Sequence, residues 1–283
     1  MPLSLSLAPF SFKLSTNIPL VNSNLEKLYP SYCFEEQAFT DYFLQVHNSG
    51  LIRQLFRKQA RFLCDLREPF KPLDYSQAFA MLEWGMNWTV ASHEMSFLLV
   101  HSAVLAKDGK AILFPAPPGS GKSTITTHLA FNGWQLLSDE MALINLKTGR
   151  CHPFVRPICL KNNSIKLAKK WFPHASFSSI AKDTHKGDVI HVSPPISSWD
   201  MRFEEAEIVG IIYPQYTAGN ILEIEALDNS NSFMQLSNNA FNFTALGKIG
   251  FDTIVKTVEK AKSFRVWHNN LIDLQDFIEE EIL

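Results

Sequence analysis

Two neighbouring stretches hold the residue types best suited to chemistry, and the first is a glycine-rich loop. The loop reads APPGSGKS, Ala116 to Ser123, and fits the phosphate-loop pattern G-x-x-x-x-G-K-[ST] except that alanine replaces the first glycine. Its glycines let backbone N–H groups turn toward phosphates, Lys122 can reach the β and γ oxygens, and the Ser123 hydroxyl can ligate Mg²⁺. We therefore expect a nucleotide to bind to Pro118, Gly119, Ser120, Gly121, Lys122, Ser123 and Thr124.

The second stretch is an acidic pair, Asp139-Glu140, at the end of a short apolar run. Kinases of small substrates often place an acid at the end of the strand that follows the loop helix. On adjacent or near-adjacent parallel strands, Asp139 and the loop would share the carboxyl edge of the sheet. There a carboxylate can hold Mg²⁺ or accept a proton from an attacking hydroxyl. The alternative is that the acidic pair forms an ordinary solvated turn at the end of the strand. Asp139 is the better candidate base because Glu140 would point to the other side of the strand; the expected metal ligands are Ser123, Asp139 and Glu140.

The segments around the loop predict how these residues are positioned. Two apolar runs, LLVHSAVLA and AILFPA, bracket an Asp-Gly turn within Lys107–Lys110, which predicts a β-hairpin whose second strand enters the loop. A helix is expected over Ser123–Phe131, closed by Asn132-Gly133. A strand over Gln135–Leu137 then leads to the acidic pair.

Other helices and strands are predicted from the spacing of apolar residues and from the turn-forming residues between them. Apolar residues at helical spacing predict a long buried helix over Tyr75–Leu99 that ends near His101. Further strands are expected in MALINL, EIVGIIYP and ILEIEAL, and tail helices over Phe251–Ser263 and Leu271–Ile282. The buried positions of the long helix are Phe79, Leu82, Met86 and Val90, with Trp84 and Trp88 as core aromatics.

The first 72 residues form a separate region by this interpretation. The segment Leu51–Arg67 is basic, which predicts the solvated face of a helix rather than a binding patch. The turn EPFKPLD, with its two prolines, marks a boundary near residue 72. We therefore expect a small N-terminal α/β appendage of unknown role at 1–72 and a catalytic α/β domain at 73–283.

Composition bounds the class of protein. A chain of 283 residues with 46% hydrophobic content can bury a full core. A net charge of −2 and a pI of about 6.5 give no global support for a nucleic-acid partner or an anionic membrane. The four cysteines have neither metal-ligand nor disulfide spacing, and no segment reads as a secretory signal or membrane span. We expect a cytoplasmic protein.

Three cations are candidates for gripping phosphates or an acidic substrate, because phosphoryl transfer gains mainly from positioned positive charge. These are Arg156, Lys161 and Lys186, and each alone fits an ordinary surface charge somewhat better than a binding role. In Thr184–Gly187, a glycine beside Lys186 suits close backbone approach to a phosphate. The neighbouring His185 also fits an ordinary loop residue.

Several of these stretches together resemble the HPr kinase/phosphorylase superfamily, and more closely its HPr-kinase-related kinase A group of bacterial proteins. The similar residues begin with LLVHSAVLAKDGKAILFPAPPGSGKSTI and GWQLLSDEMALI. They continue with RPICLKNNSI, THKGDVIHVSPP and FNFTALGKIGFDTIVKTVEKA, so that the resemblance covers nearly the whole chain.

The resemblance implies a P-loop fold similar to the catalytic domain of HPr kinase, itself similar to phosphoenolpyruvate carboxykinase: a mixed sheet with flanking helices. It implies Mg²⁺- and ATP-dependent transfer of a phosphoryl group to a serine-type hydroxyl. Asp139 matches the aspartate that acts as base in the HPr kinases, and His101 matches a histidine that lies in their site. HPr kinases are hexamers, so the resemblance also makes a homo-oligomer a possible assembly of this chain.

One family feature is missing, a Glu-Ile-Arg-Gly type signature with a second acid for metal. The second metal ligand, a reverse phosphorylase reaction and the acceptor (protein, peptide or small molecule) therefore stay open. Two alternatives also stay open: a small-metabolite kinase, and a nucleotide-binding regulatory protein that transfers no phosphate.

Overall fold

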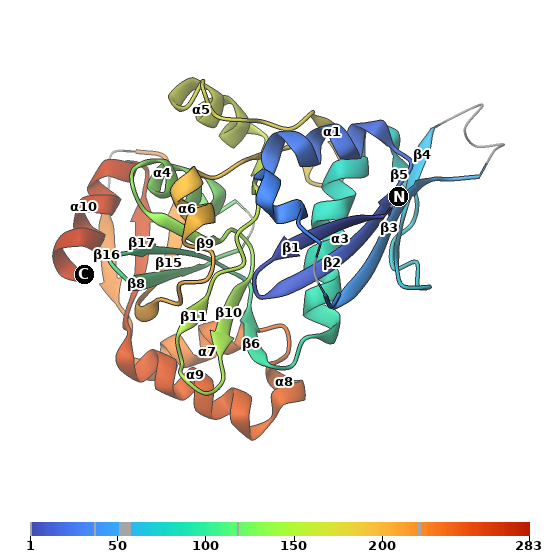
Figure 1. Cartoon of the computed structure of the whole chain (residues 1–283). Helices are drawn as coiled ribbons and strands as arrows, with labels where there is room; N and C mark the ends of the chain where they lie inside the picture. Colours follow the sequence, from blue (N-terminus) through green and yellow to red (C-terminus); the bar gives the residue numbers. More distant parts are fainter. Residues whose placement is uncertain (1, 37, 51–57, 118, 220–221) are drawn as a thin grey trace. The chain divides into compact units, whose positions relative to one another are not determined.

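The computed structural model describes residues 2–36, 38–50, 58–117, 119–219 and 222–283 (Figure 1). The chain divides into two compact units, each discontinuous in sequence. The first unit comprises the residues up to His93 together with Arg156–Ser193, and the second comprises Glu94–Val155 and Pro194–Leu283. The three boundaries follow His93, Val155 and Ser193, and none of them falls near residue 72, where the sequence predicts one.

A five-stranded sheet, in the order β1-β2-β3-β4-β5, forms one layer of the first unit. Buried side chains alternate with partly exposed ones along its strands, because successive side chains point to opposite faces and one face meets the core. β2 and β3 are parallel, and the other pairs are antiparallel. The elements of this layer are β1 (Leu3–Leu7), β2 (Phe10–Thr16), α1 (Pro19–Leu28), η1 (Ser31–Phe34), β3 (Tyr42–Asn48), β4 (Gln59–Cys64) and β5 (Leu73–Asp74).

The basic segment Leu51–Arg67 is not a helix where the structure describes it, because Gln59–Cys64 form β4. The buried residues Ala60, Phe62 and Cys64 recur at every second position, and this strand period prevails over the basic character of the segment. Arg61 lies on the more exposed face and pairs with Glu68 at 2.5 Å. Residues 51–57, which belong to the same prediction, lie outside the described residues.

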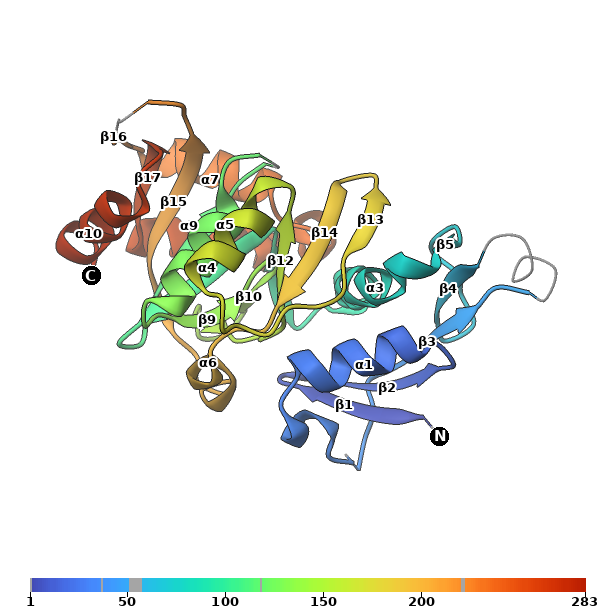
Figure 2. The ribbon, with the colours of Figure 1, turned by 90° about the horizontal axis from the view of Figure 1, so that it is seen from above.

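Helix α3 (Ala78–His93) is buried around most of its circumference. It packs on β3 and β4 on one side and on β13 and β14 on the other, which explains why its sequence is apolar all round (Figure 2). The four residues predicted to be buried are buried, whereas Trp84 and Trp88 are only partly so. The second layer is the antiparallel sheet β12-β14-β13; its elements, with the short helix before α3, are η2 (Tyr75–Gln77), β12 (Ile158–Lys161), α5 (Asn163–Trp171), β13 (Ala181–Thr184) and β14 (Gly187–Val192).

The second unit is built on a mixed six-stranded sheet in the order β16-β17-β15-β8-β7-β9. β15 runs parallel to β8 and β17, while β7 is antiparallel to both β8 and β9. Consequently β8 and β9 run in the same direction. The strands are β7 (Ser102–Lys107), β8 (Lys110–Pro115), β9 (Gln135–Ser138), β15 (Glu207–Tyr216), β16 (Glu223–Ala226) and β17 (Lys262–His268).

Helices cover both faces of this sheet, so its central strands are buried on both sides. On one face Ile254 and Val258 of α9 join the core formed by Val104, Leu113 and Ile211. α4 packs against β7 and α10 on the other face (Figure 1). The helices are α4 (Lys122–Phe131), α6 (Ile196–Asp200), α7 (Asn229–Asn238), α8 (Phe243–Leu246), α9 (Lys248–Lys260) and α10 (Leu271–Glu281).

Most predicted elements of this unit are confirmed, including the hairpin. β7 and β8 pair with Lys107 opposite Lys110, and Asp108 and Gly109 take positive φ of 51° and 75°, as a tight hairpin turn requires. The predicted strands correspond to β9, β10, β15 and β16, and the predicted helices to α4, α9 and α10.

Two predictions at element ends are wrong. The long helix ends at His93, and Phe97–Val100 form β6, which pairs with β10 (Ala142–Asn145) in a sheet completed by β11 (Cys151–His152). A short buried apolar run fits helix and strand equally well until its partner is known. Ser263, predicted at a helix end, lies in β17. Of the described helices, none has both the length and the apolar character needed to cross a membrane.

Gly85 in α3 gives a test of the packing in the first unit. A Cβ at this position would overlap the buried ring of Phe62, so we expect Gly85→Ala to lower the free energy of unfolding by about 1–3 kcal/mol through overpacking. Urea denaturation measures the loss. Gly50→Ala, where no described atom lies within 4 Å of the added Cβ, is the control. In the double variant Gly85→Ala/Phe62→Leu, the loss in the free energy of unfolding should be smaller than the sum of the two single losses, because leucine lacks the ring that the Cβ would overlap. A loss equal to that sum would contradict this account.

Candidate functional site

The glycine-rich loop connects the end of β8 to the start of α4. Gly119 and Gly121 both have φ of +91°, a left-handed conformation that glycine adopts without strain. Gly121 caps α4, and its carbonyl accepts from the N–H groups of Thr124 and Ile125 at 3.0 Å each. The N-terminal N–H groups of a helix have no intrahelical partner and favour anions. The described part of the loop could therefore hold an anion such as a phosphate. Pro118, predicted to be part of the loop, lies outside the described residues.

Lys122 and His101 meet beside the loop. The Lys122 Nζ lies 3.1 Å from the His101 Nε2. Because an ammonium group can only donate, Nε2 is the acceptor in this contact. His101 itself lies between β6 and β7; its backbone N–H donates to the Asn239 carbonyl at 2.7 Å, and its ring packs against Phe241. The structure thus brings together two of the three predicted catalytic residues.

Asp139 follows β9 at the same edge of the sheet as the loop. Ser102 of β7 lies opposite Pro115, and Val104 lies opposite Ser138, so the carboxyl ends of β8 and β9 flank the start of β7. Asp139 is 7% exposed and Glu140 is partly exposed. The expectation that Asp139 and the loop share one sheet edge is therefore met, with one antiparallel strand between them.

The donors near the loop suit a hard cation. The Ser123 hydroxyl and the carboxylates of Asp139 and Glu140 are all oxygen ligands, which Mg²⁺ prefers, and Mg²⁺ usually binds one or two carboxylates together with waters and substrate phosphates. Within the described part of the chain, no group of three or more histidine, cysteine, aspartate or glutamate residues could hold a metal ion alone. An Mg²⁺ ion held by these donors would take its remaining ligands from waters or phosphate oxygens.

The sequence did not reveal a group of buried polar atoms on the other side of the loop. These atoms are the Ser120 Oγ, the Thr217 Oγ1, both ring nitrogens of His268 and the Asn269 Oδ1, and none has a hydrogen-bond partner among the described residues. His268 ends β17, and its ring lies so close to Gly121 that a Cβ there would be 3.3 Å from two ring atoms. Only long-range pairing places β17 here, so no local pattern indicates it.

Backbone hydrogen bonds join the loop to these strand ends. The Tyr216 N–H donates to the Ser120 carbonyl at 3.1 Å, and the Thr217 N–H donates to the His268 carbonyl at 3.0 Å. Burial lowers the pKa of His268, and the nearby Ser120 backbone opposes this shift more weakly. A neutral imidazole at the loop follows at neutral pH.

The three other predicted cations, Arg156, Lys161 and Lys186, belong to the first unit, whereas the loop belongs to the second. Arg156 is buried; its Nη1 donates to the Glu83 carbonyl at 3.1 Å and to the Glu83 carboxylate at 3.3 Å, and its Nη2 donates to Asn87. The Tyr29 hydroxyl donates to the other carboxylate oxygen at 2.6 Å. Burial and Glu83 raise the pKa of Tyr29 well above its usual value, so it remains a donor. These contacts give Arg156 a structural role.

The Thr184–Gly187 cluster is the turn between β13 and β14. Gly187 has a φ of +81°, and a Cβ there would overlap the side chain of Asn162, so local packing accounts for the glycine. Lys186 lies with its Nζ 5.6 Å from the centre of the Trp84 ring, and the His185 ring meets the same indole edge-on. Lys161 is partly exposed at the end of β12.

Comparison with known proteins gives one family match. Residues 62–168 match the model of a family described as SynChlorMet cassette protein ScmC. This stretch is under half of the chain, but it contains the loop, His101, Asp139 and Arg156. No curated protein matches the chain.

The buried Arg156–Glu83 pair predicts a stability effect. Arg156→Met leaves the Glu83 carboxylate buried without its cation, so we expect a loss of about 3–5 kcal/mol in the free energy of unfolding. Arg61→Met, which breaks the exposed pair with Glu68, is the control and should change stability by less than about 1 kcal/mol. If Arg156→Met instead unfolds like the parent and only weakens ATP binding, Arg156 grips phosphate as the sequence predicts.

His268 predicts a pH dependence. Its pKa is lower in the folded chain than in the unfolded one, so the unfolded state binds more protons near the usual histidine pKa, and stability falls as pH drops through about 6.5. His268→Gln should flatten the curve of unfolding free energy against pH between about 7.5 and 5.5. His128→Gln should flatten the same curve, because burial also lowers the pKa of His128. An unchanged curve for His268→Gln would contradict this burial effect.

Proposed function

We propose that the protein is a cytoplasmic Mg²⁺- and ATP-dependent kinase that transfers the γ-phosphoryl group to a hydroxyl acceptor. The observation that carries the proposal is the meeting of the loop, the Lys122–His101 contact and Asp139 at one edge of the sheet. A phosphate loop alone supports nucleotide binding. A buried carboxylate at the same edge adds a group that can take a proton.

The reaction assigns a role to each group. The acceptor oxygen attacks the γ-phosphorus while the bond to the β–γ bridging oxygen breaks, and ADP leaves. Asp139 takes the hydroxyl proton, for which its burial is suited because water competes less for the carboxylate. Lys122 stabilises the charge on the β and γ oxygens, and His101 holds the lysine in place through the 3.1 Å contact.

Mg²⁺ would be held by Ser123 with Asp139 or Glu140, and when bound it neutralises phosphate charge. The two oxygens of Asp139 allow one to face an ion and the other an acceptor. We also propose that the second unit has the HPr-kinase-like fold; its mixed sheet, loop and acid positions support this. The description of the matched family names a cassette and no reaction, so the proposal rests on the site.

The test is transfer of labelled phosphate from ATP to host-cell extract or to free serine. We expect Lys122→Ala to lose ATP binding, and Asp139→Asn to keep ATP binding while transfer falls by about 10²–10⁴-fold. Asp276→Asn and Lys256→Ala, exposed residues of α10 and α9, are the matched controls and should behave like the parent.

The outcomes separate the alternatives. Label in small molecules alone excludes a protein acceptor and favours the metabolite kinase. If the parent binds ATP but labels nothing, and Asp139→Asn changes no measured property, the kinase proposal fails and a regulatory nucleotide-binding protein is favoured.

A further inference from the structure

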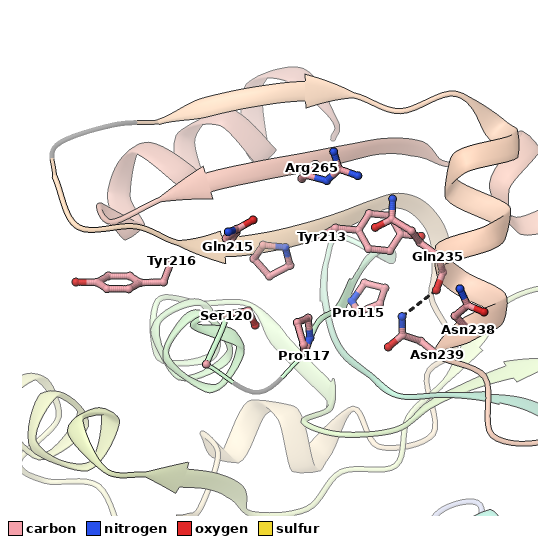
Figure 3. Close-up of a pocket in the computed structure, with 12 residues that line it drawn as sticks. Pro115, Pro117, Ser120, Tyr213, Gln215, Tyr216, Gln235, Asn238, Asn239 and Arg265 are labelled. Atoms are coloured by element: carbon pink, nitrogen blue, oxygen red, sulfur yellow. Dashed lines mark hydrogen bonds between the residues drawn. The ribbon is translucent and has the colours of Figure 1, made fainter.

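A pocket of about 510 Å³ adjoins the loop on the side of β15 and β17 (Figure 3). We call it the amide pocket, because four of its lining residues are Gln215, Gln235, Asn238 and Asn239. Its floor is formed by Pro115, Pro117, Gly119 and Ser120, and its other walls are the end of β15, Arg265 of β17 and the end of α7. Its volume lies within the range of about 300–1,000 Å³ that is usual for small-molecule sites.

The residues that line the amide pocket suit a neutral polar ligand rather than a second anion beside the phosphates expected at the loop. Gln215, Gln235 and Asn238 have no side-chain hydrogen bond within the described part of the chain, and each amide offers both donors and an acceptor. Phosphates only accept hydrogen bonds, whereas nucleobases and ribose both donate and accept. Arg265 is already paired with the Glu225 carboxylate at 2.6 Å, which compensates its charge.

The buried Ser120 hydroxyl is a second, independent sign of a ligand. Ser120 is 6% exposed and lines the pocket, and its Oγ has no partner among the described residues. A buried hydroxyl without a hydrogen bond is unfavourable by about 1–3 kcal/mol, so a ligand or water that supplies one would be stabilised. In Figure 3 Ser120 lies across the pocket from Gln215, while the Tyr216 ring points away.

The sheet order decides which end of a nucleotide the pocket would take. β7 and β9, on one side of β8, place His101 and Asp139; β15 and β17, on the other side, supply the pocket. A triphosphate whose γ end faces Asp139 therefore has its nucleoside end on the β15 side. We propose that the amide pocket binds the nucleoside of the nucleoside triphosphate, an inference that rests on the proposed function.

The test compares binding of Mg²⁺-ATP with binding of inorganic Mg²⁺-triphosphate by calorimetry. The parent should bind ATP more tightly than triphosphate by on the order of tenfold or more, because the nucleoside adds at least two hydrogen bonds. The double variant Gln235→Leu/Asn238→Leu should bind triphosphate like the parent and lose most of the preference for ATP. Asn229→Leu, an exposed asparagine at the other end of α7 and outside the pocket lining, is the matched control.

Gln215→Ala provides a second variant on a different element, in case the changes in α7 prevent folding. It should also lower the preference for ATP while triphosphate binding stays the same. If neither variant changes that preference, the inference is wrong although the kinase proposal stands. If both keep the preference but phosphoryl transfer slows, the pocket belongs to the acceptor, which also overturns the inference. A parent that binds neither ligand would contradict the proposed function itself.

Discussion

The antiparallel pairing of β7 with both β8 and β9 fixes the relative positions of His101, the glycine-rich loop and Asp139 in the candidate site. Because Ser102 lies opposite Pro115 and Val104 opposite Ser138, His101, the loop and Asp139 all emerge at one sheet edge. A shift of one residue in this register would turn the side chains of β7 to the opposite face and separate His101 from Lys122. The chemistry is thus positioned by a rigid sheet rather than by long loops.

The main cluster of buried polar groups in the first unit differs from that in the second in its hydrogen bonds. In the first unit, Arg156 and Tyr29 both donate hydrogen bonds to Glu83, which links the end of α1, α3 and the chain before β12. In the second unit, Ser120, Thr217 and His268 are buried beside the loop with side-chain atoms that lack partners among the described residues. Folded proteins keep few such groups. A ligand bound beside the loop could supply the hydrogen bonds that these atoms lack.

Local patterns predicted the parts of the structure that depend on local physics. The Asp-Gly turn at Asp108-Gly109, the helix after the loop and the strand before Asp139 all follow from neighbouring residues. Contacts between distant segments decided the rest. Phe97–Val100 became a strand because β10 pairs with it, Arg156 was drawn into the core by Glu83, and β17 reached the loop only through β15. No local sequence pattern distinguishes His268, or Gln235 and Asn238 of α7, from ordinary surface residues.

The discontinuity of the two units sets an order for folding during synthesis. β7, β8 and β9 are neighbours in the chain and can pair as soon as they leave the ribosome. The parallel partner of β8 is β15, whose first residue, Glu207, pairs with Lys110. The sheet β12-β14-β13 of the first unit is made in between. Until then the strand that leads into the glycine-rich loop has one unpaired edge, which can associate with other chains. A nascent chain halted before residue 207 would therefore expose this edge and lack the strand that supports the loop from the other side.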